Sequence, residues 1–257
     1  MPKYELTNEK IIHENGITLY RIRDLKTKVL GGYVEGEANL AQSGTAWIAD
    51  TARVFGNAIV SDSAQVQDEA WVFDNAVLSG ECIVSGYAWV FGTAKISGNA
   101  TVERHAIVCG DATIADQSCV RGHCRISGSA RIHDSVQVSG DAQVSGKALI
   151  LGSAVIEGEA RVTGSCSVSE NSTVFDSARV HGEAVVNGSA RVFGNANVHG
   201  LARISGEARV FGSAVISGKA QIIGQAWVYD SAEVGGTTML DGTARVNQSQ
   251  SMLKAEN

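Results

Sequence analysis

The residues of this chain that could do chemistry recur at intervals of eighteen positions. His105 and His123 are eighteen positions apart, and so are His181 and His199. Histidine exchanges protons near neutral pH, but a general base also needs a defined geometry toward the proton that it takes. Polar side chains on the outside of a repeat mostly contact water. Both pairs could therefore exchange protons, with solvated surface histidines as the alternative.

Aromatic residues in the first half of the chain follow the same interval. The candidate interface residues of this group are Phe55, Trp71, Phe73, Trp89 and Phe91. They occupy slots that we expect to point outward, and exposed apolar area of this size usually marks an interface. Aromatic stacking between neighbouring strands could also explain them. We expect a binding or subunit contact here, next to Ile107 and Cys109.

A second group lies nearer the C-terminus. Its members are Phe175, Arg191, Phe193, Arg209, Phe211 and Tyr229, with Trp227 on a neighbouring strand. Arg191 and Arg209 are eighteen positions apart and could hold an anion such as a phosphate or a carboxylate. The alternative is a pair of solvated arginines beside a structural stack.

All these residues lie in one uninterrupted six-residue repeat from Ala46 to Ser249, of the form small-x-aliphatic-x-Gly-x, with 34 copies. The first and third slots are two positions apart, so on a strand both point to the same side. Gly or Asp in the fifth slot tolerates the backbone of a tight corner. Arg104, Glu170 and Gln248 depart from this rule, so we expect local strain or a different corner there.

The interval of eighteen predicts three repeats per coil, because this winding stacks residues eighteen apart on one side of a triangular prism. The sequence therefore predicts an all-β protein, a single-stranded triangular parallel β-helix of about eleven coils. We assign residues 46–249 to the β-helix, residues 1–45 to an N-terminal β cap with an irregular first coil, and residues 250–257 to a short tail.

The cap is expected because the first coil of a solenoid exposes unpaired backbone and an apolar end. Alternating residues predict strands at Tyr4–Thr7 and Ile17–Arg23, with a turn at Glu14–Gly16 between them. The segments Gly31–Val34 and Ala38–Leu40 are typical of a poorly phased first coil.

Composition excludes several classes of protein. The 257 residues are 44% hydrophobic and 19% charged, with a formal net charge of −6. No apolar run reaches membrane-spanning length, and the first ten residues lack the apolar core of a signal peptide. A net negative charge with interspersed arginines argues against nucleic-acid binding. We therefore expect a cytoplasmic protein that binds neither a membrane nor nucleic acid.

The five cysteines predict no disulfide and no metal site. Cys82, Cys124 and Cys166 occupy the inward small slot, where a thiol packs like an alanine of slightly larger volume. Cys109 and Cys119 take outward slots on different registers. No cysteine spacing fits a metal site, and we expect a reduced protein without a cofactor.

The pairing of an aliphatic residue with a small residue four positions later, as in Val54…Ala58 and Val210…Ala214, resembles hexapeptide-repeat left-handed β-helix proteins. Many members have glycine directly after the aliphatic residue, whereas Gly56 follows Val54 by two. Bactofilin-like polymer-forming proteins have a related rhythm and wind right-handed. The resemblance implies a left-handed β-helix, with the right-handed form as the alternative.

The cap carries a more specific resemblance. The segments Leu19–Leu25, Gly31–Glu35 and Asn39–Leu40, ahead of Trp47, resemble the start of the YdcK-like proteins. These are β-helical proteins of enterobacteria and their phages that are commonly labelled transferases without an established activity. The resemblance covers the cap and the repeat together.

Two functions remain open, the first based on the aromatic residues and the second on the resemblance to hexapeptide-repeat proteins. The first is a non-catalytic binding or scaffold protein, in one version phage-encoded. It would present its aromatic ladders for self-assembly, with a homotrimer implied by look-alike families, or to a host protein or small ligand. The alternative is an acyltransferase that uses acyl-CoA, with His105 or His123 as general base in a groove between subunits and Glu103 nearby in sequence. Those enzymes commonly carry a loop excursion from the coil, and this repeat has none.

Overall fold

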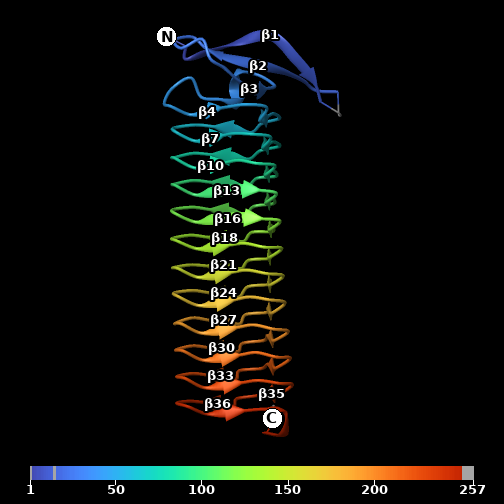
Figure 1. Cartoon of the computed structure of the whole chain (residues 1–257), viewed down its shortest axis with the longest axis vertical. Helices are drawn as coiled ribbons and strands as arrows, with labels where there is room; N and C mark the ends of the chain where they lie inside the picture. The colour runs from blue at the N-terminus through green and yellow to red at the C-terminus, as the bar shows by residue number, and fades with distance from the viewer. Residues whose placement is uncertain (1, 14–15, 251–257) are drawn as a thin grey trace. The chain divides into compact units, whose positions relative to one another are not determined.

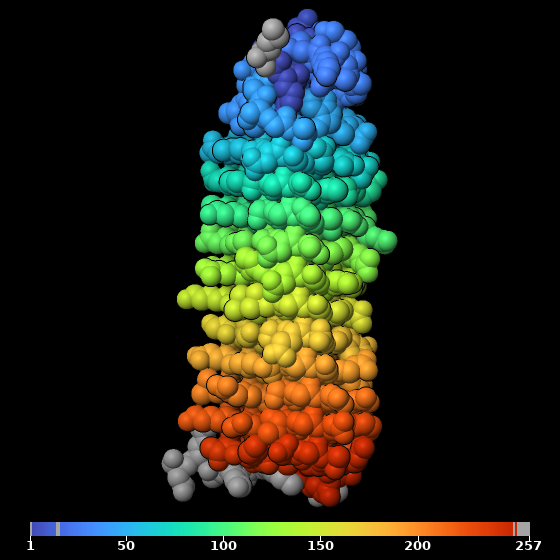
Figure 2. Space-filling view, turned by 90° about the vertical axis from the view of Figure 1, so that its left-hand side faces the viewer, coloured from blue at the N-terminus to red at the C-terminus, as the bar shows by residue number. Residues whose placement is uncertain are grey.

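The structure is a computed structural model that describes residues 2–13 and 16–250. It consists of two compact units, which we call unit 1 (residues 1–123) and unit 2 (residues 124–257) and describe separately. Each unit is a β-solenoid in which three short strands make one coil and three parallel sheets run along the stacked coils (Figure 1). In the space-filling view each coil forms a layer of side chains (Figure 2). The predicted all-β parallel β-helix is confirmed.

Unit 1 begins with the cap strands. After the cap, each of its sheets contains four or five described strands of the repeat, one from each coil. The first sheet contains β1 (Tyr4–Ile12), β2 (Thr18–Asp24), β3 (Leu30–Val34), β5 (Arg53–Val54), β8 (Trp71–Val72), β11 (Trp89–Val90) and β14 (Ile107–Val108). The second contains β4 (Trp47–Ile48), β7 (Gln65–Val66), β10 (Ile83–Val84), β13 (Thr101–Arg104) and β16 (Cys119–Gly122). The third contains β6 (Ile59–Val60), β9 (Val77–Leu78), β12 (Lys95–Ile96) and β15 (Thr113–Ile114).

Unit 2 has three sheets of seven strands each among the described residues. One contains β17 (Arg125–Ile126), β20 (Gln143–Val144), β23 (Arg161–Val162), β26 (Arg179–Val180), β29 (Asn197–Val198), β32 (Val215–Ile216) and β35 (Glu233–Val234). Another contains β19 (Gln137–Val138), β22 (Val155–Ile156), β25 (Thr173–Val174), β28 (Arg191–Val192), β31 (Arg209–Val210), β34 (Trp227–Val228) and β37 (Arg245–Val246). The last contains β18 (Arg131–Ile132), β21 (Leu149–Ile150), β24 (Ser167–Val168), β27 (Val185–Val186), β30 (Arg203–Ile204), β33 (Gln221–Ile222) and β36 (Met239–Leu240).

The coils are joined by parallel backbone hydrogen bonds with a register of eighteen residues. In unit 1 Trp71 pairs with Trp89, and the Trp71 N–H donates to the carbonyl of Ala88 at 2.9 Å. In unit 2 Arg191 pairs with Arg209 in the same way. The aliphatic third slot is buried in every copy, because it points to the same inner side as the small first slot. The predicted period of eighteen residues per coil is confirmed.

The corners explain the fifth slot. Glycines there have positive φ, and an added Cβ at Gly188 would lie 2.8 Å from the backbone of Gly206 in the next coil. The eight aspartates of this slot also adopt positive φ. Asp176, for example, accepts a hydrogen bond at Oδ2 from the N–H of Gly194 one coil on, at 3.0 Å. An aspartate at this corner therefore lacks the conformational freedom of glycine but can form a hydrogen bond to the next coil.

Two of the predicted exceptions keep the same corner. Arg104 (φ 65°) and Glu170 (φ 61°) lie in the left-handed region, which costs a residue with a Cβ about 1–2 kcal/mol. At Arg104 the pairing also continues through the corner, because Arg104 is in register with Gly122. Gln248 instead begins the short 3₁₀ helix η2 (Gln248–Gln250).

The cap folds over the first coil. Strands β1 and β2 pair antiparallel, β2 pairs antiparallel with β3, and β3 pairs parallel with β5. The buried Tyr4 hydroxyl donates to the carbonyl of Leu40 at 2.9 Å. After the 3₁₀ helix η1 (Glu37–Asn39), Asn39 Nδ2 donates to the carbonyl of Ala58 at 2.9 Å. The predicted strands are present, although β1 extends to Ile12. Glu14 and Asn15 of the predicted turn lie outside the described residues.

Candidate functional site

Three outward columns of side chains run from coil to coil along the first sheet of unit 1 and the corners that precede its strands. We call them the Tyr-His column (Glu69, Tyr87, His105 and His123), the Trp column (Trp71, Trp89 and Ile107) and the Phe column (Phe55, Phe73, Phe91 and Cys109). The columns exist because outward slots alternate with inward alanines on each strand, and every coil repeats them eighteen residues later.

Stacking rings hold the Trp and Phe columns in place. The Trp71 and Trp89 rings lie 5.2 Å apart at 8°, and the Phe73 and Phe91 rings lie 4.8 Å apart at 5°. Phe73 also meets Trp89 edge to face at 6.5 Å and 75°. Offset stacks and edge contacts of this kind contribute about 0.5–1.5 kcal/mol each. The predicted first group is therefore one connected aromatic surface.

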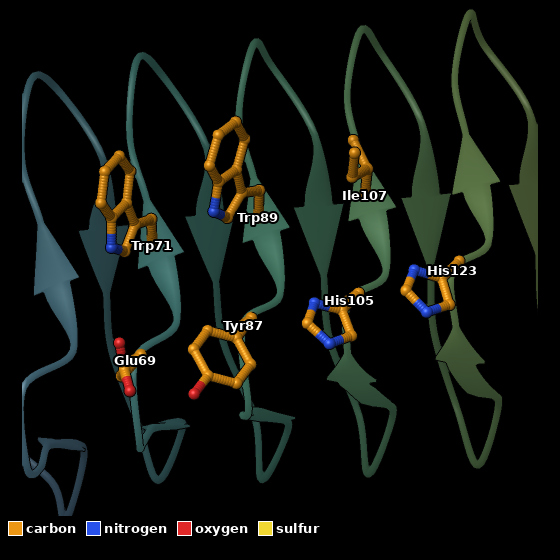
Figure 3. A pocket seen from close by; sticks show the side chains of 7 residues that line it. All are labelled: Glu69, Trp71, Tyr87, Trp89, His105, Ile107 and His123. Atoms are coloured by element: carbon orange, nitrogen blue, oxygen red, sulfur yellow. The ribbon is translucent and has the colours of Figure 1, made fainter.

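A groove of about 430 Å³ lies between the Tyr-His and Trp columns (Figure 3). Its walls include large side chains that remain open to solvent, since Tyr87 is 52% exposed and Trp89 is 41% exposed. Figure 3 shows both indole nitrogens, of Trp71 and Trp89, on the side of the Trp column that faces Glu69 and Tyr87. The groove therefore combines apolar ring edges with hydrogen-bond donors.

One carboxylate lies at the end of the groove. The Glu69 carboxylate raises the pKa of the Tyr87 hydroxyl, first by hydrogen bonding and second by its charge. Both side chains are at the surface, where water weakens such interactions. The raised pKa therefore indicates that the two side chains lie close together, and it does not indicate that either acts as a base. Tyr87 is the residue that links Glu69 to the histidines.

The structure brings the two candidate histidines into this groove. The Tyr87 and His105 rings stack at 5.0 Å and 4°, and the His105 and His123 rings stack at 4.6 Å and 4°. Glu103, which is close to His105 in sequence, belongs to β13 of another sheet and is not part of the groove lining. Glu69 is thus the acidic residue that shares the groove with the histidines.

The expectation that Phe55 is exposed is wrong. Phe55 is only 6% exposed, because the cap strands cover it and pack it against Leu19 and Tyr33. The His13 ring also lies 4.8 Å from the Phe55 ring. Cys109, at the other end of the Phe column, is also only 6% exposed. Phe55 therefore joins the aromatic surface to the cap and does not face a partner.

The second predicted group lies on one sheet of unit 2. The rings of Phe175, Phe193, Phe211 and Tyr229 stack in succession at 4.8, 4.9 and 5.5 Å. The arginines of the neighbouring column cover aromatic faces. The Arg191 guanidinium lies 5.1 Å from the Phe175 ring centroid, and that of Arg209 lies 4.9 Å from the Trp227 ring centroid.

Three residues of these surfaces were not foreseen. Glu69 and Tyr87 precede His105 and His123 at intervals of eighteen, so the same spacing that identifies the histidines could have found them. Arg245 follows Trp227 by eighteen positions, and its guanidinium lies 3.7 Å from the Trp227 ring centroid. In each case the sequence places a residue able to form hydrogen bonds eighteen positions from an aromatic ring, and this spacing could have been noticed.

The repeat matches a known family model at three places in the chain. Residues 52–68, 94–110 and 202–218 match the model of the YdcK β-solenoid repeat. These matches confirm the resemblance to YdcK-like β-helix proteins at the level of the repeat. A search of curated proteins gave no match.

We also searched the described residues for a metal site and for a membrane-spanning helix. In residues 2–13 and 16–250 no three His, Cys, Asp or Glu side chains gather closely enough to hold a metal ion. In the same part of the chain no helix has the length and apolar character needed to cross a membrane. The groove of unit 1 is lined by two tryptophans, a tyrosine, two histidines, a glutamate and an isoleucine.

Proposed function

We propose that this chain is a non-catalytic β-helical binding protein and that it self-associates through the groove and the aromatic columns of unit 1. The observation that carries the proposal is the exposure of Tyr87 and Trp89 on opposite walls of one groove. Large aromatic side chains grouped in this way lose contact with water when a partner covers them, which favours association.

The aromatic walls are also prepared for binding. The Trp71 and Trp89 rings already stack on each other, so little side-chain freedom remains to be lost on association. Neither indole N–H makes a hydrogen bond with the rest of the described chain. A partner that offers acceptors along the groove would satisfy both donors.

A second copy of this chain is the occupant that we favour. The columns repeat from coil to coil at about 4.8 Å, and an identical chain carries the same spacing. Side chains of two copies can therefore interlock over several coils. Closed rotational symmetry then gives a defined oligomer. We expect a trimer because the look-alike hexapeptide-repeat families imply one. A host protein or a small ligand would be the other occupants of the same groove.

The mass of the protein in solution tests this proposal. Light scattering behind size-exclusion chromatography should give about three times the chain mass of 26.9 kDa. The mass should stay constant over a wide concentration range, because a specific interface forms a closed assembly. A monomer at every concentration would contradict self-association through this groove.

A second candidate function is acyl transfer. It is favoured by the position of His105 and His123, which line the same groove as Glu69 and Tyr87. An imidazole in a groove between subunits could act as general base toward an acceptor hydroxyl or amine, with acyl-CoA as the donor. Calorimetric titration with acetyl-CoA should then give saturable heat that the His105→Ala variant alters. A wild-type protein that gives no heat would contradict this function.

A further inference from the structure

A second hollow, of about 210 Å³, lies on unit 2 and is independent of the proposed function. Its lining consists of Glu207, Arg209, Gln225, Trp227, Thr243 and Arg245. The residues belong to β31, β34 and β37 and to the corners just before these strands. Arg209, Trp227 and Arg245 are in parallel register, so one tryptophan separates two arginines along the column.

Trp227 holds both guanidinium groups. Their Cζ atoms lie 4.9 Å (Arg209) and 3.7 Å (Arg245) from the centroid of the Trp227 ring. A cation over an indole face is stabilised by the ring quadrupole, and a planar guanidinium also stacks on it. A guanidinium that stacks on an indole keeps its N–H edges available for hydrogen bonds.

Neither guanidinium of this column forms an ion pair with a described residue. The Glu207 carboxylate of the hollow accepts a hydrogen bond from Gln225 Nε2 at 3.0 Å and pairs with neither arginine. Arg191 adds a further like charge, because it is in register with Arg209. Like charges directly opposite each other on a sheet are destabilising.

We infer that the hollow between Arg209 and Arg245 binds a small anion, a carboxylate or a phosphoryl group. The N–H edges of the two arginines would donate to the anion, and the Thr243 hydroxyl offers a further donor from the same lining. Two arginines against one carboxylate leave the hollow positive. Bound anion would also offset the repulsion along the arginine column.

Titration of the full chain with inorganic phosphate and, separately, with acetate tests the inference. Ionic strength is kept constant with chloride, and the guanidinium N–H resonances of Arg209 and Arg245 are followed by NMR. We expect saturable shifts at both residues with at least one of the two anions. The anion that binds more tightly identifies the class of ligand. If neither anion gives saturable shifts, the inference is overturned.

Variants separate this site from general charge attraction. Arg209→Gln and Arg245→Gln should each raise Kd roughly tenfold or more, because each removes charge-assisted hydrogen bonds. Arg179→Gln is the matched control, since Arg179 also pairs in register with an arginine, Arg161, but lies over no aromatic ring in the described residues. An equal loss of affinity in Arg179→Gln would overturn the inference.

Discussion

Trp71 and Trp89 lie eighteen residues apart in the chain, yet their indole rings stack at 5.2 Å with an angle of 8° between them. Each ring shields one face of the other, so the groove contacts ring edges and indole N–H groups. A partner must therefore fit a wall of fixed edges at coil spacing. The stack thus holds one wall of the groove whose exposed rings, Tyr87 and Trp89, support the proposed function.

The cap should be needed to keep Phe55 covered. Leu19 is fully buried against Tyr33 and Phe55, so Leu19→Ala should destabilise the cap by about 2–5 kcal/mol. Hydrogen exchange should become faster in β1 and β2, while the coils distant from the cap stay protected. Ile12→Ala, at a position that is 74% exposed, is the control and should change little. Unchanged exchange in Leu19→Ala would contradict the role of the cap.

Aspartate corners should stabilise the stacking of coils. Asp176→Ala removes the hydrogen bond to Gly194 and keeps a Cβ at φ 57°, so it should cost about 0.5–1.5 kcal/mol. Asp176→Gly loses the same bond but relaxes the left-handed backbone, and it should cost less. Denaturant unfolding measures both variants. A glycine variant less stable than the alanine variant would argue against this explanation.

The inward cysteines should be inert in the folded protein. Burial raises the pKa of the Cys82 thiol to about 12 and that of Cys166 to about 11, and only a thiolate reacts with iodoacetamide. Mass spectrometry after brief labelling should therefore find Cys119, which is half-buried, modified before these two. Denaturant should remove the difference. Rapid labelling of Cys82 in native protein would show that the coils open more easily than this packing allows.

Stability should decrease in mild acid through His199. Burial first, and the charge of His181 second, lower the pKa of His199 from 6.5, so the unfolded chain binds the proton more readily. The contribution of His199 is complete above pH 6.5 and is lost as the pH falls from there toward the pKa of the folded state. His199→Gln should flatten the change in Tm between about pH 7.5 and about pH 5.5. An unchanged pH dependence in this variant would contradict the assignment.

The sequence predicts the repeating part of the fold well because every coil imposes the same constraints. Strands β4 to β37 follow the 34 copies of the repeat one for one within the described chain. Even Arg104, whose side chain disfavours positive φ, adopts the corner at 65° because the coils on either side fix it. Prediction fails where the repeat ends. Phe55 occupies the same slot as Phe73, and only the non-periodic cap buries it.

Only part of the candidate site could be predicted, because the repeat determines the spacing of residues but not the shape of the surface. Periodicity identifies which residues stack, so His105, His123, Trp71 and Trp89 could be grouped from the sequence. It does not show that the Tyr-His and Trp columns leave a groove between them, because that depends on the directions in which the side chains project. Tyr87 precedes His105 by eighteen positions, so the sequence could have placed it in the column, but not on the wall of a groove.

The most direct test of the proposed function compares two surface variants by sedimentation velocity. Trp89→Glu places a charge on the wall of the groove, whereas Ile59→Glu places one at a similarly exposed position (45% against 41%) on another sheet of unit 1. Burying an unpaired carboxylate in an interface is strongly unfavourable. We predict that wild-type protein and Ile59→Glu sediment as the same oligomer and that Trp89→Glu sediments as a monomer. An assembly that persists unchanged in Trp89→Glu would contradict association through the groove.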